Sequence, residues 1–147
     1  MRHYLTFKLA TALSITLIGL FASFHGVVIA GIVLGDYVPL EFLWGGRFES
    51  RTQLLTFEFV SLLVLLACLA IVLIRSGMFG SRRWVRATTG ALWVLCVLFA
   101  LNTVGNLLAK TTFEKSLAVV TAALAVSCWR MAVEKYAPNT DGGNAGK

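Results

Sequence analysis

The chain has 147 residues, of which 58% are hydrophobic and only 14% are charged, and its mean hydropathy is +0.81. Soluble domains carry roughly 25% charged residues, so this composition excludes a soluble globular protein. The net charge of +6 rests on basic residues at the ends of apolar segments, which indicates membrane topology rather than nucleic-acid binding. We expect an all-α membrane protein with one four-transmembrane-helix domain over residues 1–135 and a disordered cytoplasmic tail over 136–147.

The first apolar segment covers about residues 9–34 and exceeds the ~30 Å of hydrocarbon that a helix must cross at about 1.5 Å per residue. Its basic start, Arg2 and Lys8, is typical of a signal peptide. However, the apolar run is too long for such a peptide, and no small-x-small cleavage site precedes a polar stretch. We therefore interpret the segment as an uncleaved membrane anchor.

The loop over residues 35–53 is unusually apolar for a connection in water. Its apolar residues are Val38, Leu40, Phe42, Leu43 and Trp44. Pro39 can start a short helix and the Gly45-Gly46 pair can end it. This pattern predicts an interfacial helix on the outer leaflet, which could cover whatever lies between the spans.

Three further apolar segments, at about 54–74, 87–109 and 117–133, are each long enough to span a membrane. Ser50 with Gln53, and Thr111 with Glu114, have the spacing of helix capping boxes, so both of these helices should begin ahead of their apolar runs. The cysteines are Cys68, Cys96 and Cys128, one in each segment. They form no C-x-x-C or Cys/His pattern and are expected to act as small buried hydrophobes. No cofactor or metal signature is present.

The distribution of Lys and Arg predicts the orientation. Nine of them lie on one face of the predicted bundle and four on the other, which are Arg47, Arg51, Lys110 and Lys115. The positive-inside rule then places both termini in the cytoplasm and loops 35–53 and 110–116 outside. Trp84 and Trp129 fall near the inner boundary and Trp44 near the outer one, as in an aromatic belt.

Strongly polar residues inside the apolar segments are candidates for function, because hydrocarbon does not solvate them. They are His25, Glu58, Asn102 and Asn106. Counting the helical rise from the outer ends of the apolar runs places Glu58 and Asn106 about 5–6 Å deep, and His25 and Asn102 about 11–13 Å deep. The sequence thus predicts two polar layers in the outer half of the bundle.

Asn102, Asn106 and Lys110 repeat at four-residue spacing and should form one polar stripe on the third helix, with Glu58 facing Asn106 below Lys110. The first outer loop adds charged residues over the same end, giving a mixed-charge vestibule. These residues are Glu41, Arg47, Glu49 and Arg51. We consider seven residues as a ligand-binding set: Glu58, His25, Asn102, Asn106, Lys110, Arg47 and Glu41.

Each candidate also has a structural interpretation. The two asparagines can serve as interhelical hydrogen-bond donors, Glu114 as a capping carboxylate, and His25 as a donor to a backbone carbonyl. Arg47 can bind a phosphate or carboxylate, or pair with Glu49 or Glu58.

Small residues repeat at four-residue spacing on the first and fourth helices. The rows are Ala22, Gly26 and Ala30; Gly31 and Gly35; and Ala118 and Ala122. Such rows allow close helix approach, either within the bundle or across a dimer seam.

The strings at 39–47 (PLEFLWGGR) and 101–115 (LNTVGNLLAKTTFEK) resemble a group of small, uncharacterised four-span bacterial membrane proteins, and the resemblance covers about residues 39–130. It implies a four-span protein of the bacterial inner membrane and supplies no activity.

Three functions follow from these patterns. The first is binding or transport of a small or lipidic ligand in a polar pocket of the outer half, with membrane lipid as a partner and a homo-oligomer for transport. The second is a structural or accessory subunit that docks a membrane-protein partner. The third, less favoured, is an enzyme acting on a lipid head group, with Glu58 or His25 as general acid/base and Arg47 or Lys110 holding a phosphate.

Overall fold

The computed structural model describes residues 5–40, 43–79 and 82–134. These residues form four α-helices, α1 (Phe7–Leu34), α2 (Arg51–Arg75), α3 (Arg82–Leu107) and α4 (Thr112–Val133), and one short 3-10 helix, η1 (Trp44–Gly46). No strand occurs in the described ranges. Each α-helix is long and apolar enough to cross a membrane, which confirms the all-helical architecture with four candidate spans.

The helix starts confirm that α2 and α4 begin ahead of their apolar runs. The Ser50 hydroxyl accepts from the Gln53 N–H, and the Thr111 hydroxyl accepts from the Glu114 N–H, both at 3.2 Å. These bonds satisfy N–H groups that have no partner inside their helices. The return bonds differ from a standard capping box: Gln53 accepts from the Glu49 N–H, and Glu114 accepts from the Thr111 hydroxyl.

At its C-terminal end, α3 stops before the apolar run does. The helix ends at Leu107, so the expected span to residue 109 is too long and Lys110 lies in the connection to α4. The chain must reverse here, and Thr111 needs extended backbone (φ −87°, ψ 144°) to cap α4. Both requirements end α3 before Lys110.

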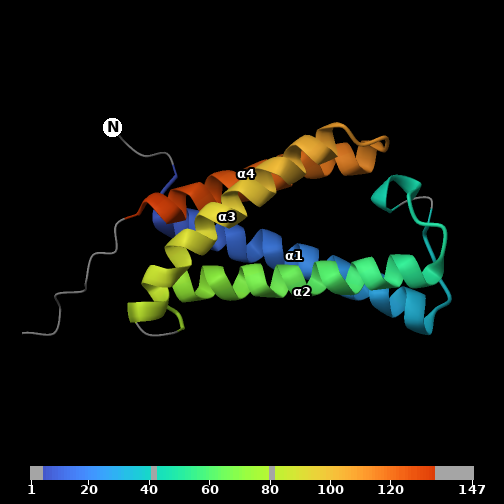
Figure 1. Ribbon diagram of the computed structural model, residues 1–147, viewed down its shortest axis with the longest axis horizontal. Coiled ribbons are helices and arrows are strands. Elements are labelled where there is room, and N and C mark those ends of the chain that lie inside the picture. The colour runs from blue at the N-terminus through green and yellow to red at the C-terminus, as the bar shows by residue number, and fades with distance from the viewer. Residues whose placement is uncertain (1–4, 41–42, 80–81, 135–147) are drawn as a thin grey trace, which may run out of the picture.

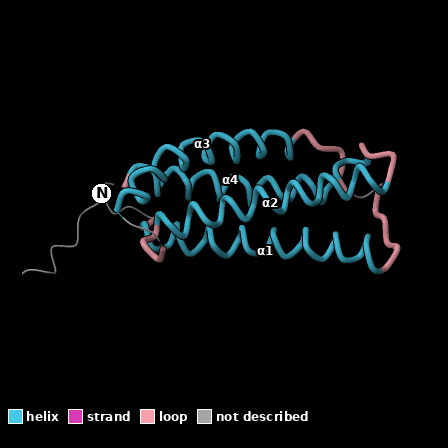
Figure 2. The backbone as a smooth tube through the Cα atoms, turned by 60° about the horizontal axis from the view of Figure 1, so that its bottom comes forward, coloured by secondary structure: helices cyan, strands magenta, loops and turns pink. Residues whose placement is uncertain are grey.

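The four helices form two antiparallel pairs, α1 with α2 and α3 with α4 (Figures 1 and 2). The pairs come together at the end that holds the starts of α1 and α3, which we call the closed end. They diverge at the opposite end, which we call the open end, where the segment over residues 35–50 lies (Figure 1).

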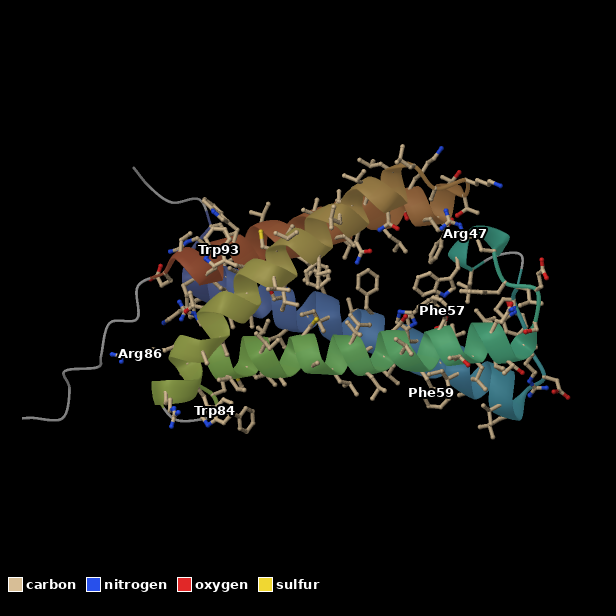
Figure 3. All side chains as sticks on the ribbon, in the orientation of Figure 1. Arg47, Phe57, Phe59, Trp84, Arg86 and Trp93 are labelled. Carbon is tan, nitrogen blue, oxygen red and sulfur yellow. The ribbon has the colours of Figure 1, made fainter. Side chains whose placement is uncertain are left out.

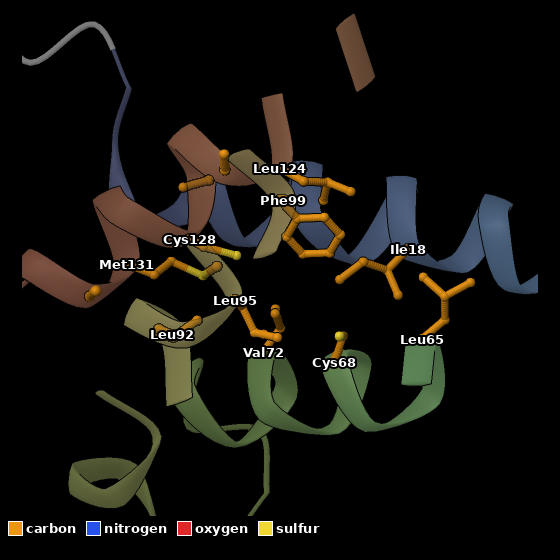
Figure 4. Close-up of a cluster of buried hydrophobic side chains, with 13 residues drawn as sticks. Ile18, Leu65, Cys68, Val72, Leu92, Leu95, Phe99, Leu124, Cys128 and Met131 are labelled. Atoms are coloured by element: carbon orange, nitrogen blue, oxygen red, sulfur yellow. The ribbon is translucent and has the colours of Figure 1, made fainter. Parts of the chain in front are cut away.

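A hydrophobic core joins all four helices toward the closed end (Figure 4). Its labelled members are Ile18, Leu65, Cys68, Val72, Leu92, Leu95, Phe99, Leu124, Cys128 and Met131. Cys68 and Cys128 are buried and all three cysteines are free, which confirms their role as small hydrophobes for these two. By contrast, large apolar side chains on every helix face outward, as lipid requires; examples are Val27, Leu63, Val97 and Val119.

A second, smaller core attaches the first loop to the α1–α2 pair. Leu43 is buried with Val28, Ile32 and Leu54, and Val38, Leu40 and Phe48 pack against this group. These apolar residues of the loop therefore pack against α1 and α2, the helices that the loop connects. The only helical turn described in this loop is η1, and residues 41–42 lie outside the described ranges.

Arg75 joins three helices at the closed end. It is the last residue of α2 and only 6% exposed. Its guanidinium donates to the Met131 and Glu134 carbonyls at the end of α4, and to the Val85 carbonyl and Thr89 hydroxyl in α3. The terminal carbonyls of a helix lack intrahelical partners, so α4 offers suitable acceptors. The sequence pattern placed Arg75 only among the basic residues that set orientation.

Candidate functional site

A cavity of about 450 Å³ lies between the two helix pairs on the side of the open end. All four helices and the first loop contribute to its wall. Its polar lining residues are His25, Trp44, Glu58, Ser61, Asn102, Asn106, Glu114 and Thr121. Its apolar lining residues are Leu20, Phe21, Phe24, Leu43, Val64, Leu65, Cys68, Phe99, Phe113 and Leu117.

Glu58 is the centre of the polar wall. It is fully buried, and its two carboxylate oxygens have different partners. Oε2 lies 2.5 Å from Nδ1 of His25, and Oε1 accepts from the indole N–H of Trp44 at 2.9 Å. Three segments of the chain, α1, α2 and the first loop, therefore meet at one carboxylate. A buried carboxylate requires such partners, because an unpaired charge is costly away from water.

Trp44 holds an unusual backbone conformation. Its φ of 54° lies in the left-handed region, which bulky residues rarely adopt. Its ring contacts Phe57 of α2 with a centroid distance of 5.9 Å and Phe48 of the loop at 6.2 Å. Figure 3 shows Phe57 on the loop-facing side of α2 and Phe59 on the opposite side. The aromatic contacts and the bond to Glu58 together hold the indole in the wall of the cavity.

The contact between His25 and Glu58 corrects the two-layer prediction. Arg51, the first residue of α2, donates to the Ile32 carbonyl and to the Asp36 carboxylate, so the start of α2 is level with Ile32. Glu58 follows Arg51 by seven residues (58 − 51), and His25 precedes Ile32 by seven (32 − 25), so both side chains reach the same level. The depth estimate was wrong because it counted from the ends of the apolar runs, whereas α1 projects beyond the start of α2.

The two asparagines of α3 both line the cavity, as the sequence suggested. Asn106 also donates to the Thr121 hydroxyl at 3.5 Å, and Thr103 donates to the same hydroxyl at 3.0 Å. Asn106 thus has both of the roles expected from the sequence: it forms a hydrogen bond between α3 and α4, and it lines the cavity. Glu58 and Asn106 line the same cavity, and the hydrogen-bond partners of Glu58 are His25 and Trp44.

Two of the remaining predicted residues, Lys110 and Arg47, are not among the described lining residues of the cavity. Lys110 is exposed in the α3–α4 connection, so it does not extend the asparagine stripe on the helix. Arg47 is exposed, takes part in no ion pair among the described residues, and is absent from the described lining. Glu41 lies outside the described residues. Arg51 pairs with Asp36 at 2.7 Å on the outside of the loop.

Sequence reasoning missed several wall residues. Trp44 was assigned to an aromatic belt, and Glu114 to a cap alone, yet both line the cavity. Phe24 and Phe113 add aromatic rings whose centroids lie 6.2 Å apart across α1 and α4. The two glycines after Trp44 were the available signal for its position, since they permit a tight turn that directs a side chain back toward the helices.

The polarity of the cavity changes along its length. Trp44, Glu58, Asn106 and Glu114 line it toward the open end, whereas Leu65, Cys68 and Phe99 line it toward the core. From Glu58 to Cys68 the axis of α2 rises about 15 Å. The cavity is therefore amphipathic. Within the described residues, no three His, Cys, Asp or Glu side chains gather where they could hold a metal ion.

The fold and the cavity define a class: a bundle of four candidate membrane helices with a buried His–Glu–Trp set in the wall of an interhelical cavity. Comparisons of the chain with models of known protein families, with curated proteins and with solved structures gave no match.

Proposed function

We propose that this protein is a multi-pass membrane protein that binds an amphipathic ligand in the cavity between its two helix pairs. The ligand's polar end contacts the His25–Glu58–Trp44 set, and its apolar end extends toward Phe99 and Cys68. The observation that carries the proposal is the gradient from polar to apolar lining, because hydrophobic walls with a few placed polar groups are typical of small-molecule sites.

The position of the basic residues supports binding over lipid head-group chemistry. An enzyme acting on a phosphorylated lipid needs a cation that holds the phosphate. The two residues considered for that role, Arg47 and Lys110, are exposed and are not among the described lining residues. The wall instead offers carboxylate, amide, hydroxyl and indole groups.

The orientation belongs to the same proposal. We place both termini in the cytoplasm of a bacterial cell and the open end outside, because the sequence pattern assigns nine of the 13 Lys and Arg residues to the cytoplasmic side. The first loop then lies at the outer interface, where its exposed aromatic residues suit the head-group region.

A cavity-filling variant tests the function. Ser61→Phe puts a ring into the cavity from α2, whereas Val60→Phe puts the same ring on the outer surface, where Val60 is 53% exposed. Native mass spectrometry of protein released from lipid nanodiscs reports the ligand that each variant retains. We expect Ser61→Phe to lose a bound mass that the wild type and Val60→Phe keep, and Glu58→Gln to retain less of it.

Circular dichroism shows whether each variant is folded. A folded Ser61→Phe protein that retains the same adduct as Val60→Phe would contradict binding in this cavity. The native mass spectra also give the oligomeric state. A transport role requires more than one copy of the chain.

An accessory subunit is the second candidate, and the open surface of α1 at Gly26 favours it. No atom of the described structure beyond the helix's own backbone lies within 4 Å of where a Gly26 side chain would begin. Gly26 and the exposed Ala30 therefore leave room for another helix, whereas Ala22 packs against the core of this bundle. Gly26→Leu should then abolish co-purification of a partner in mild detergent, whereas Gly90→Leu, at an equally open glycine of α3, should not. Identical co-purification from both variants would refute docking at this surface.

A further inference from the structure

The ionisable groups of the cavity wall are mainly acidic. Its described lining contains two carboxylates, Glu58 and Glu114, and one histidine, and it contains no Lys or Arg. The lining therefore offers more acidic than basic groups. An anionic head group would be repelled here, and a cationic one attracted.

The two carboxylates of the wall differ in exposure, since the Glu58 side chain is fully buried and that of Glu114 is half-buried. Each Glu58 oxygen has one protein partner, Nδ1 of His25 or the indole N–H of Trp44, and a carboxylate has about four lone-pair positions in all. Glu114 is half-buried and accepts from the Thr111 hydroxyl through Oε2. A donor with several N–H groups, such as an ammonium, suits these acceptors.

Aromatic rings surround the same region. The Phe24 ring lies 6.2 Å from that of Phe113 and 5.7 Å from that of His25, and the His25 ring lies 6.5 Å from that of Trp44. These rings come from α1, α4 and the first loop. Aromatic faces attract cations within about 6 Å and do so more strongly where water is excluded.

We propose that the cavity selects a cationic amphiphile, with a protonated amine held by Glu114 beside the His25–Glu58 pair and among these rings. The proposal rests on the binding function above and specifies the chemistry of its ligand. The three observations act together: the excess of acidic over basic groups favours a cation, the carboxylate oxygens favour an N–H donor, and the aromatic rings stabilise a weakly hydrated cation.

Three probes with the same tail test the sign of the charge: dodecylamine, dodecanol and dodecanoate. Equilibrium dialysis of each radiolabelled probe against protein-loaded and empty nanodiscs at neutral pH separates binding to the protein from partitioning into lipid. Because the tails are identical, differences between probes report the head group. We expect dodecylamine to bind the protein at least tenfold more tightly than dodecanol, and dodecanoate to bind more weakly than both.

The variants test the residues. Glu58→Gln and Glu114→Gln should each reduce dodecylamine affinity by tenfold or more and leave dodecanol unchanged. Glu49→Gln, an exposed carboxylate outside the lining, should change neither. If Glu58→Gln does not fold, Glu114→Gln and Glu58→Asp still report on the charge.

The outcomes separate this inference from the function on which it rests. Equal binding of all three probes that is lost in Ser61→Phe would overturn charge selection and leave amphiphile binding intact. A preference for dodecanoate would also overturn it. No binding of any probe above that of empty nanodiscs would overturn both.

Discussion

Replacing Arg75 by Met tests what holds the helix pairs together at the closed end. Met has a similar length and an apolar character that suits the surrounding core, so the variant removes the donors without creating a large cavity. It leaves the Met131 and Glu134 carbonyls without the guanidinium, and it breaks the bond from Nη1 to the Thr89 hydroxyl, which measures 3.0 Å.

The expected cost follows from these bonds. The buried Met131 carbonyl left without a donor costs about 1–2 kcal/mol, and the lost bonds to the part-buried Glu134 carbonyl and to Thr89 cost about 1 kcal/mol each, which gives about 3–4 kcal/mol in total. Arg75→Lys should cost less, about 2 kcal/mol, because one ammonium keeps a charge but cannot reach acceptors on both α3 and α4. Arg86→Met, on the exposed surface of α3, should change the free energy of unfolding by less than about 0.5 kcal/mol.

Unfolding by SDS in mixed micelles, followed by circular dichroism, measures these free energies. The order wild type, Arg86→Met, Arg75→Lys and Arg75→Met is expected from most to least stable. If Arg75→Met costs no more than Arg86→Met, then the buried guanidinium does not stabilise the closed end, and apolar packing alone joins the pairs.

Two further substitutions have direct readouts. Trp44→Phe keeps the ring contacts with Phe48 and Phe57 but loses the N–H donor to Glu58. We expect the affinity for the amphiphile to fall several-fold while the helix content stays unchanged. Unchanged affinity would exclude the indole from the site. Thr111→Ala removes the cap of α4 and should cost about 1 kcal/mol by SDS unfolding, whereas Thr112→Ala, one residue into the helix, should cost only a few tenths. Equal losses from both threonines would show that the cap contributes nothing specific.

The fold was largely predictable because the signals that fix it are local. Apolar runs of span length define the four helices, and hydroxyl residues at Ser50 and Thr111 mark two of the starts. The end of α3 was not predictable from hydropathy, since Leu108 and Ala109 continue the apolar run. Their position outside the helix follows from the chain reversal and from the backbone that the next cap requires.

The residue types of the site were predictable from the sequence, but the predicted geometry of the site was wrong. Glu58 and His25 stood out because hydrocarbon does not solvate them, and the structure places them in contact. The relative level of the two side chains depends on the axial offset between α1 and α2. The bonds of Arg51 to Ile32 and Asp36 show this offset, which the sequence of neither helix alone determines. Trp44 belongs to the site through a backbone conformation that composition does not reveal.

The location of the cavity follows from how the two ends of the bundle are joined. At the closed end, the core side chains and Arg75 connect α2 with α3 and α4. At the open end, the first loop packs its apolar residues against the α1–α2 pair. Leu43 contacts Val28, Ile32 and Leu54 and does not bridge to α3. The Phe24–Phe113 ring contact joins the pairs there without filling the space between them. An amphipathic ligand can therefore bind at this end by completing the contacts between the helix pairs, which gives binding a way to stabilise the bundle as a whole.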